Sequence, residues 1–265
     1  MKSWLFTPAT KPERFSKASE VHADVIILDL EDAVAPAQKI EARHHALQAI
    51  QTLKKDIKVA VRINNVASKI GFEDFITFLQ AKHVPHYLIL PKSDPAVITR
   101  FLQKLISDYN KNISIIPMIE SNDGLESLKM YQDKEVEFVL YGAADMSADL
   151  MVSEDSQTLK TIESEIIQYA NQQQIAVIAS PYFDINNLDG LKSSTQMYKD
   201  NGYSCRAVIH PNHVDTVNSI FSPTDEEIIW AQQILEINTL GVGRHNGQMV
   251  DEAIARRARH ILNMK

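Results

Sequence analysis

Short apolar runs recur along the chain and alternate with longer segments of more polar sequence. The runs are nearly continuously apolar rather than alternating, which is typical of parallel strands covered on both faces. The predicted strands are Trp4–Phe6, Val25–Leu30, Val59–Ile63, Tyr87–Leu90, Ile113–Ile119, Phe138–Tyr141, Ile175–Ala179 and Ala207–Ile209. We therefore expect a parallel sheet whose strands are joined by helices.

Several of the intervening segments carry apolar residues at helical spacing. Helices are predicted over 38–55, 96–109, 159–173, 228–240 and 251–262. Pro95 directly precedes the second of these, and proline is well tolerated at a helix start. Thr224 and Glu227 form a capping box, T-D-E-E, ahead of the fourth. Strands and helices thus alternate along most of the chain.

Eight strands alternating with helices predict an α/β fold, a (β/α)8 TIM barrel. An open doubly wound sheet is the alternative, although it would normally have fewer strands or a visible break. No repeat or linker divides residues 1–240, which we expect to form one catalytic barrel domain. Residues 241–265 hold three of the eight glycines and the last helix, and they are predicted to form a C-terminal arm or lid.

Composition and charge narrow the class of protein. Lys and Arg number 27 against 34 Asp and Glu, and this net charge of −7 argues against a nucleic-acid partner. The single cysteine, Cys205, excludes an internal disulfide and is expected to be buried and inert. The apolar runs are too short for a signal peptide or a membrane span, so we expect a cytoplasmic protein with no membrane partner.

Polar side chains follow nearly every predicted strand. They are Thr7, Asp29, Glu31, Asp32, Arg62, Asn64, Lys92, Glu120, Asp145, Ser180 and His210. The active site of a (β/α)8 barrel lies at the C-terminal ends of its strands. We therefore expect a site that is rich in carboxylates and also holds an arginine.

Glu120 and Asp145 follow neighbouring predicted strands, so one cation can lie within reach of both carboxylates. Converging carboxylates raise one another's pKa, and a divalent cation removes that repulsion. Mg²⁺ typically takes one or two carboxylates and leaves positions for substrate oxygens. The alternative is that each carboxylate caps the helix that follows it.

Arg62, in V-R-I-N, is a natural partner for a substrate carboxylate because a guanidinium donates two parallel hydrogen bonds to it. The alternative is an internal ion pair with Asp29, Glu31 or Asp32.

Seven motifs, taken in order, resemble the citrate lyase β-subunit-like proteins. This branch of the HpcH/HpaI aldolase superfamily includes malyl-CoA and citramalyl-CoA lyases. The motifs are LFTPATKPERFSKA, ILDLEDAVAPAQKIEAR, VRIN, LPKSD, IPMIESNDGL, YGAADMSADL and GYSCRAVIHPNH. Each motif alone is weak, but seven in order are a strong signal, and the similarity as a whole runs from Leu5 to the final helix.

The resemblance implies a barrel that binds Mg²⁺ and cleaves or forms a carbon–carbon bond in a short acyl-CoA. It makes Glu120 and Asp145 the metal ligands and Arg62 the residue that binds the 2-oxo acid product. Glu31 and Asp32 would hydrogen-bond water on the metal.

The C-terminal GQMVDEAIARRARHIL is also similar to the family's last segment. Its Asp251 matches an acidic residue that family members supply from a neighbouring subunit, where it would protonate the enolate carbon. The resemblance thus implies a homotrimer or hexamer, with the arm docked on a neighbouring subunit and each site completed in trans.

Five basic residues are candidates to contact CoA phosphates. Many family members carry a lysine just before I-H-P, where this chain has Arg206, and arginine also binds phosphate well. The others are Lys11, Arg14, Lys39 and Arg43, each of which is equally compatible with a solvated helix position.

The leading hypothesis is cleavage of (S)-citramalyl-CoA to acetyl-CoA and pyruvate. Malyl-CoA lyase and malyl-CoA thioesterase activities are alternatives, and so is a β subunit of a multi-subunit citrate lyase. The arm with Asp251 favours an enzyme that works without a carrier subunit.

Overall fold

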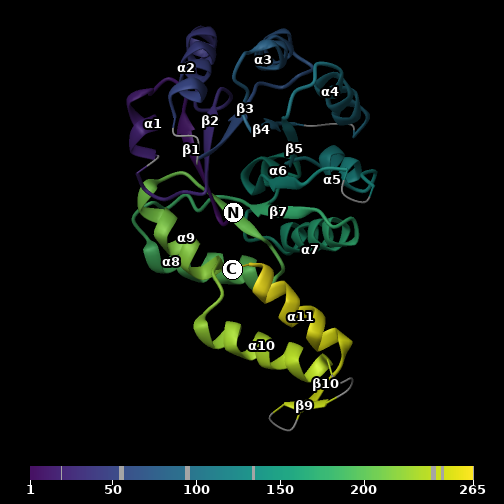
Figure 1. The fold of residues 1–265 in the computed structure, drawn as a ribbon. Helices are drawn as coiled ribbons and strands as arrows, with labels where there is room; N and C mark the ends of the chain where they lie inside the picture. Colours follow the sequence, from purple (N-terminus) through teal and green to yellow (C-terminus); the bar gives the residue numbers. More distant parts are fainter. Residues whose placement is uncertain are drawn as a thin grey trace. The chain divides into compact units, whose positions relative to one another are not determined.

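Eight parallel strands close into a barrel in sequence order, β1 to β8, which confirms the predicted fold (Figure 1). The strands are β1 Ser3–Pro8, β2 Val25–Asp29, β3 Lys58–Arg62, β4 Tyr87–Leu90, β5 Ser114–Ile119, β6 Phe138–Tyr141, β7 Ala176–Ala179 and β8 Cys205–Val208. Each contains or overlaps one predicted run. The alternative of an open sheet is excluded, because β1 pairs in parallel with both β2 and β8.

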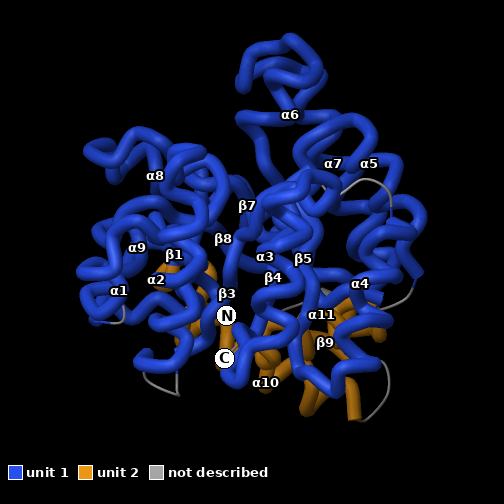
Figure 2. Tube along the Cα trace, turned by 90° about the horizontal axis from the view of Figure 1, so that it is seen from above, with its two compact units in different colours: residues 1–217 blue, residues 218–265 orange. Residues whose placement is uncertain are grey.

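The structure is a computed structural model that describes residues 1–18, 20–53, 57–92, 96–132, 135–239, 243–245 and 248–264. The chain divides into two compact units, Met1–Val217 and Asn218–Lys265, coloured separately in Figure 2. Across the described part of the chain, no helix combines the length and the apolar character needed to cross a membrane.

Helices follow the barrel strands, and the last of them continues from the first unit into the second. They are α1 Glu13–Ala18, α2 Lys39–Thr52, α3 Lys69–Gln80, α4 Ala96–Asp108, α5 Asn122–Leu128, α6 Ala143–Asp149, α7 Gln157–Gln172, α8 Leu188–Asp200 and α9 Val214–Phe221. Short polar side chains begin several of them: Ser68 caps α3 by accepting from Gly71 N, and Ser156 caps α7 by accepting from Leu159 N. Pro95, predicted to precede α4, lies outside the described residues.

The barrel interior is filled by alternate residues of the strands. Trp4, Tyr87 and Phe138 pack together at its amino-terminal end, with the Trp4 ring centroid 5.2 Å from each of the other two. Smaller interior residues such as Ala60 and Ala207 lie in the same cluster. Residues of the opposite alternation pack under the helices, as Val139 and Val177 do against α7. This alternation decides which strand-end side chains reach the site.

The second unit contains α10 Asp225–Thr239, a two-stranded antiparallel sheet and α11 Glu252–Asn263. The predicted capping box is confirmed: Thr224 N donates to Glu227 Oε2 at 2.9 Å, and Glu227 N donates to Thr224 Oγ1 at 3.1 Å. Ala231, Ile234 and Ala258 form part of the core between the two helices.

The predicted arm, 241–265, lies within this unit together with α10. Its strands, β9 Gly243–His245 and β10 Gln248–Val250, were not predicted, since three residues are too few for a periodic pattern. Docking of the arm on a neighbouring subunit stays a prediction.

Candidate functional site

The carboxyl ends of the barrel strands, here called the mouth, line a cavity of about 420 Å³. Asp29 and Arg62 point into it because they continue the inward alternation of Ile27 and Ala60. The polar residues of its lining are Asp29, Asp32, Arg62, Asp145 and Ser180. The apolar residues include Phe6, Pro8, Met118, Leu140, Pro181, Phe183 and Ile209.

Arg62 and Asp29 form a buried bidentate ion pair. They lie opposite each other in the β2–β3 register; Arg62 Nε donates to Oδ1 at 2.7 Å, and Nη2 donates to Oδ2 at 2.6 Å. The Phe6 ring centroid is 4.9 Å from the guanidinium carbon. Burial by itself lowers the pKa of Arg62, but the bonds to Asp29 and the surrounding carboxylates raise it overall. The internal pairing considered as an alternative for Arg62 is therefore present.

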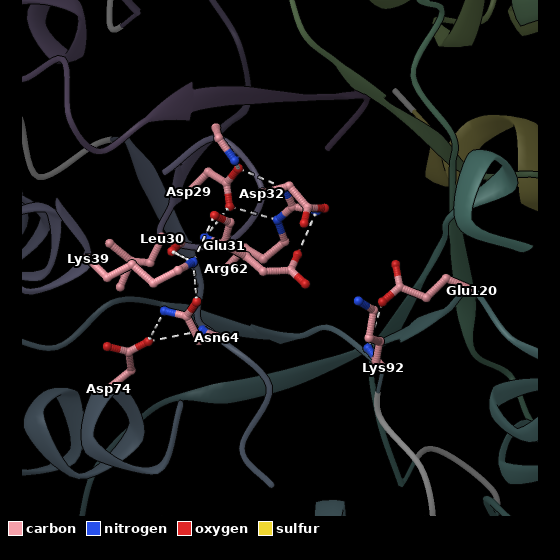
Figure 3. Close-up of polar contacts among 11 residues, drawn as sticks. Asp29, Leu30, Glu31, Asp32, Lys39, Arg62, Asn64, Asp74, Lys92 and Glu120 are labelled. Atoms are coloured by element: carbon pink, nitrogen blue, oxygen red, sulfur yellow. Dashed lines mark hydrogen bonds and ion pairs between the residues drawn. The ribbon is translucent and has the colours of Figure 1, made fainter. Parts of the chain in front are cut away.

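Glu31 and Asp32 face the third nitrogen of Arg62. Arg62 Nη1 lies 3.1 Å from Glu31 Oε2 and 3.5 Å from Asp32 Oδ2, and Figure 3 shows these carboxylates gathered around the guanidinium. The Glu31 contact lacks hydrogen-bond geometry, so within the described part of the chain this buried oxygen has no hydrogen-bond partner. Burial raises the pKa of Glu31 to about 8; Arg62 opposes the shift, while Asp32 and Glu120 add to it.

Glu120 follows β5 and lies apart from the Arg62 cluster in Figure 3. Its Oε1 accepts a 2.6 Å hydrogen bond from the backbone N–H of Lys92, which follows β4. Burial raises the pKa of Glu120 to about 7; the Lys92 bond lowers it, and the neighbouring Asp145 raises it. A nearly fully buried carboxylate held by one backbone amide retains lone pairs for a further partner.

Gly142 makes room for Glu120. β5 pairs with β6 so that Ile119 lies opposite Tyr141, which brings the next residues, Glu120 and Gly142, side by side. A Cβ built on Gly142 would lie 2.8 Å from Glu120 Cβ and 3.0 Å from Oε2, closer than side chains tolerate. Sequence analysis did not single out Gly142, although a glycine directly before A-A-D at a strand end is a signal of close approach.

Asp145 lies in the first turn of α6, beside the end of β6, and is exposed. It faces the same cavity as Arg62, and its charge acts on Glu120. The helix-cap alternative does not hold for Glu120, because Ser121 caps α5 by accepting from Gly124 N at 3.0 Å. For Asp145 the first-turn position is itself favourable to a carboxylate, so that alternative stays open.

The donor set of the mouth fits a hard divalent cation. Burial raises the pKa of both Glu31 and Glu120, and Glu31 Oε2 has no hydrogen-bond partner among the described residues. Both features mark carboxyl groups that are poorly stabilised as anions, which a bound cation would offset. Among the described residues no cluster of three or more His, Cys, Asp or Glu side chains could hold a metal, so the candidate ligands are the pair Glu120 and Asp145. Two carboxylates with water are a common Mg²⁺ environment.

Lys39 and Arg43, predicted to contact CoA, both lie on α2 and bond within the chain. Lys39 Nζ donates to Leu30 O, Glu31 O and Asn64 Oδ1. Arg43 Nε donates to the buried Asp74 at 2.6 Å. Their contact with CoA stays a prediction, and the described bonds give each an internal role.

The three other CoA candidates differ in accessibility. Lys11 and Arg14 are exposed where the chain leaves β1. Arg206 is 1% exposed and points away from the barrel interior: it donates to Ser180 O at 3.0 Å, to Thr195 Oγ1 at 2.8 Å and to Ser194 Oγ at 3.0 Å. Its contact with CoA also stays a prediction.

Asp251 belongs to the second unit and caps α11, where its Oδ1 accepts from Ile254 N at 3.0 Å. Its place in a neighbouring subunit's site stays a prediction. Cys205 is fully buried, as expected, and burial raises the pKa of its thiol to about 12.

Asp74 was missed by sequence analysis because it lies within a helix, away from any strand end. Its neighbours in the sequence could have identified it, because α3 buries Asp74 beside Phe75 and Phe78. A carboxylate on an apolar helix face indicates a buried partner.

Comparison with known proteins agrees with the motif resemblance. A model of the HpcH/HpaI aldolase/citrate lyase family matches residues 2–211. The mitochondrial citramalyl-CoA lyase of Rattus norvegicus is 27% identical over 98% of this chain and 84% of its own. The citrate lyase subunit beta of Leuconostoc mesenteroides subsp. cremoris is 27% identical over 99% of this chain and 92% of its own.

Solved structures share the fold over most of the chain. RipC from Yersinia pestis is 33% identical with a TM-score of 0.75, covering 86% of this chain and 98% of that one. CitE from Mycobacterium tuberculosis, in complex with magnesium, acetoacetate and coenzyme A, is 26% identical with a TM-score of 0.82, covering 99% and 97%.

Proposed function

Because the chain belongs to the HpcH/HpaI aldolase/citrate lyase family, we propose that it is a Mg²⁺-dependent carbon–carbon lyase acting on a short 3-hydroxyacyl-CoA. Our preferred substrate is (S)-citramalyl-CoA, which gives acetyl-CoA and pyruvate. The observation that carries the proposal is the mouth itself: two buried carboxylates with raised pKa, Glu31 and Glu120, follow β2 and β5 at the same end of the barrel as the cavity that Arg62 and Asp145 line.

Glu120 and Asp145 would hold the metal ion. When bound, Mg²⁺ supplies a Lewis acid that lowers the pKa of the substrate hydroxyl and offsets charge on the 2-oxo acid. The named relatives support a CoA substrate, and the CitE structure was determined with magnesium and coenzyme A.

Arg62 would orient the carboxylate at the oxo-acid end. Asp29 engages Nε and Nη2 and so fixes the plane of the guanidinium, while Nη1 is directed to where Glu31 and Asp32 lie. Glu31 and Asp32 would accept hydrogen bonds from water in the site. A guanidinium fixed in advance costs no reorganisation when charge develops.

Cleavage breaks the bond between the hydroxyl-bearing carbon and the thioester α-carbon, and the hydroxyl proton would pass to water that Glu31 and Asp32 hold. The electron pair of that bond passes to the thioester as an enolate. Asp251 of a neighbouring subunit would then deliver a proton to the α-carbon, in a homotrimer or hexamer. Lys11 and Arg14, exposed after β1, are the basic residues best available to CoA phosphates.

Phe6, Met118 and Leu140 favour a product with a methyl group, because they add apolar surface to the cavity that holds Arg62. Pyruvate has such a methyl and glyoxylate does not. One methyl or methylene group in an apolar pocket typically contributes about 1–3 kcal/mol to discrimination, so malyl-CoA is expected to be the poorer substrate rather than an excluded one.

A β subunit of a citrate lyase is the second candidate, because the Leuconostoc relative has the same 27% identity as the citramalyl-CoA lyase and covers 99% of the chain. Such a subunit would release an oxo acid only with its partner subunits present.

The deciding experiment is product analysis of the purified protein with citramalyl-CoA and with malyl-CoA, each with Mg²⁺ and with EDTA. Metal-dependent acetyl-CoA plus pyruvate is the expected result. Free CoA with the intact hydroxy-diacid would indicate a thioesterase instead. If neither substrate reacts until citrate lyase partner subunits are added, the second candidate is correct.

A further inference from the structure

Lys39 reaches from the first turn of α2 to the ends of two barrel strands. Its ammonium donates to Leu30 O at 3.1 Å, to Glu31 O at 3.0 Å and to Asn64 Oδ1 at 2.5 Å, as Figure 3 shows. Three N–H groups therefore meet three acceptors, which is the full capacity of a lysine. Two acceptors belong to the turn after β2 and the third follows β3, so one side chain joins both segments that carry the Arg62 cluster.

Asn64 presents its oxygen to Lys39 because its other groups are engaged by Asp74. The backbone N–H and Nδ2 of Asn64 both donate to Asp74 Oδ2, at 3.0 and 2.7 Å. The other oxygen of Asp74 accepts from Arg43 at 2.6 Å, and Asp74 is fully buried. Lys39, Asn64, Asp74 and Arg43, here called the Lys39 network, therefore tie the mouth to α2 and α3.

The turn needs such a restraint. It carries the buried Glu31 carboxylate, whose Oε2 accepts no hydrogen bond from any described residue, next to a second carboxylate, Asp32. Burial of Glu31 and the like charge of the exposed Asp32 both favour movement of the Glu31 carboxylate out to water. Asp29 holds the inner side of the turn by accepting from Glu31 N at 3.0 Å and Ala33 N at 3.2 Å. Lys39 holds the other side of the turn through the carbonyl oxygens of Leu30 and Glu31.

We infer that Lys39 is a positioning residue: by joining the Leu30 and Glu31 carbonyls to Asn64, it holds the Glu31 and Asp32 carboxylates in the mouth beside Arg62. The inference rests on the proposed function, since positioning matters only if these carboxylates serve the reaction. It differs from a role in CoA binding, for which the resemblance made Lys39 a candidate. Loss of a CoA contact raises KM, whereas loss of positioning lowers kcat.

The test removes the ammonium and then restores it chemically. Lys39→Cys places a thiol on a half-buried helix position, and 2-bromoethylamine converts that thiol to an aminoethyl thioether, a close analogue of lysine, with loss of bromide. The native Cys205 will not compete, because it is fully buried and burial raises its pKa to about 12. Iodoacetamide, which adds a neutral group, is the reagent control. Lys104→Cys, at an exposed lysine that pairs with Asp108 on the same helix, is the matched control variant.

We expect kcat of Lys39→Cys with citramalyl-CoA to fall about 10–100-fold with KM nearly unchanged, the usual size for loss of a group that orients a metal site. Aminoethylation should restore most of kcat, and carbamidomethylation should not. Hydrogen exchange of a peptide covering the Leu30–Val34 turn should be faster in the variant and slow again after aminoethylation. Lys104→Cys should match the wild type throughout.

A raised KM with unchanged kcat would overturn the inference in favour of CoA binding. Faster exchange in the turn with full kcat would show that Lys39 is merely structural. If Lys39→Cys does not fold, Asn64→Ala takes its place, with a smaller expected loss of kcat and the same rise in exchange. Where both fold, the double variant should lose less than the sum of the two, since the residues share one bond.

Failure of the proposed function is distinguishable from failure of the positioning inference, because in that case the wild type cleaves neither acyl-CoA. The positioning inference is then decided by Mg²⁺ affinity, measured by calorimetry on the full chain, together with exchange in the turn. A 10-fold or greater loss of affinity that aminoethylation reverses supports the inference. Unchanged affinity overturns it.

Discussion

At the scale of single residues, the carboxylates of the mouth differ in their partners rather than in their chemistry. Asp29 has both oxygens bonded to Arg62. Glu31 and Glu120 are also buried, but neither is hydrogen-bonded to a cationic side chain among the residues that the structure describes, and burial raises the pKa of both. A divalent cation gives the largest stabilisation to carboxylates whose ionised form is otherwise unfavourable.

Gly142→Ala tests whether the close approach of Glu120 matters. The added Cβ would lie 2.8 Å from Glu120 Cβ, so Glu120 must move away from β6. We expect Mg²⁺ affinity to fall about 10–100-fold, as when other groups that orient a ligand are changed. Calorimetric titration checks this. Ala148→Ser, at an exposed position of α6, is the control, and wild-type affinity in Gly142→Ala would show that Glu120 is not a ligand.

At the scale of elements, the site is formed by residues at the strand ends whose side chains point into the barrel. Arg62 and Asp29 meet because β2 and β3 are in register and both residues point inward. Arg206 belongs to the opposite alternation of β8, so its guanidinium meets α8 under the helix layer instead of the mouth. A shift of one position along a strand thus decides whether a side chain points into the site or packs under the helices.

Arg206→Lys should therefore reduce stability. Lysine cannot donate at once to Ser180 O, Thr195 Oγ1 and Ser194 Oγ in the arginine geometry, which leaves buried acceptors unbonded. We expect the free energy of unfolding to fall by about 1–3 kcal/mol, with KM for the acyl-CoA unchanged. Denaturant unfolding and steady-state kinetics measure the two effects, and Lys192→Met on the exposed side of α8 is the control. A raised KM with full stability would instead support a CoA contact.

At the scale of the whole molecule, the carboxylates of the mouth make the free energy of unfolding depend on both pH and bound metal. Between the ordinary carboxyl pKa of 4.5 and the raised values of about 8 for Glu31 and about 7 for Glu120, the folded state holds protons that the unfolded state has lost. The metal-free protein therefore loses stability as pH rises through this range. Mg²⁺ binds the ionised form, so its stabilising effect grows with pH.

Thermal unfolding from pH 5 to 9, with Mg²⁺ or EDTA, checks this coupling. We expect Tm in EDTA to fall as pH rises toward 8, and the increase in Tm caused by Mg²⁺ to be larger at pH 8 than at pH 6. Glu120→Gln should show little response to Mg²⁺ and a flatter pH dependence. An equal Mg²⁺ effect at both pH values would contradict the assignment.

Completion of the site by a neighbouring subunit is also a property of the whole assembly. Glu120→Gln and Asp251→Asn should each be inactive, and asparagine keeps the cap of α11 because it serves as well as aspartate there. If the sites form in trans in a homotrimer, mixing the two proteins with subunit exchange should restore about a quarter of the wild-type activity. No recovery in mixtures shown by mass spectrometry to contain hybrid oligomers would exclude it.

The sequence by itself determined what depends on neighbours along the chain. Apolar runs predicted the eight strands of the barrel, T-D-E-E predicted the start of α10, and the order of strand-end residues placed Asp29, Arg62, Glu120 and Asp145 at one end of a barrel. These follow from local periodicity and from the rule that parallel strands end on the same side. The motifs identified the family for the same reason.

Only the tertiary structure decided which partner each charged group takes. Sequence left Arg62 with three internal candidates, and the register selected Asp29 for the bidentate pair. It left Lys39 as a candidate for CoA or a solvated helix position, whereas packing of α2 brings its ammonium to Asn64, 25 positions away. A side chain's partner is set by distances between segments remote in sequence, and local patterns carry no record of those distances.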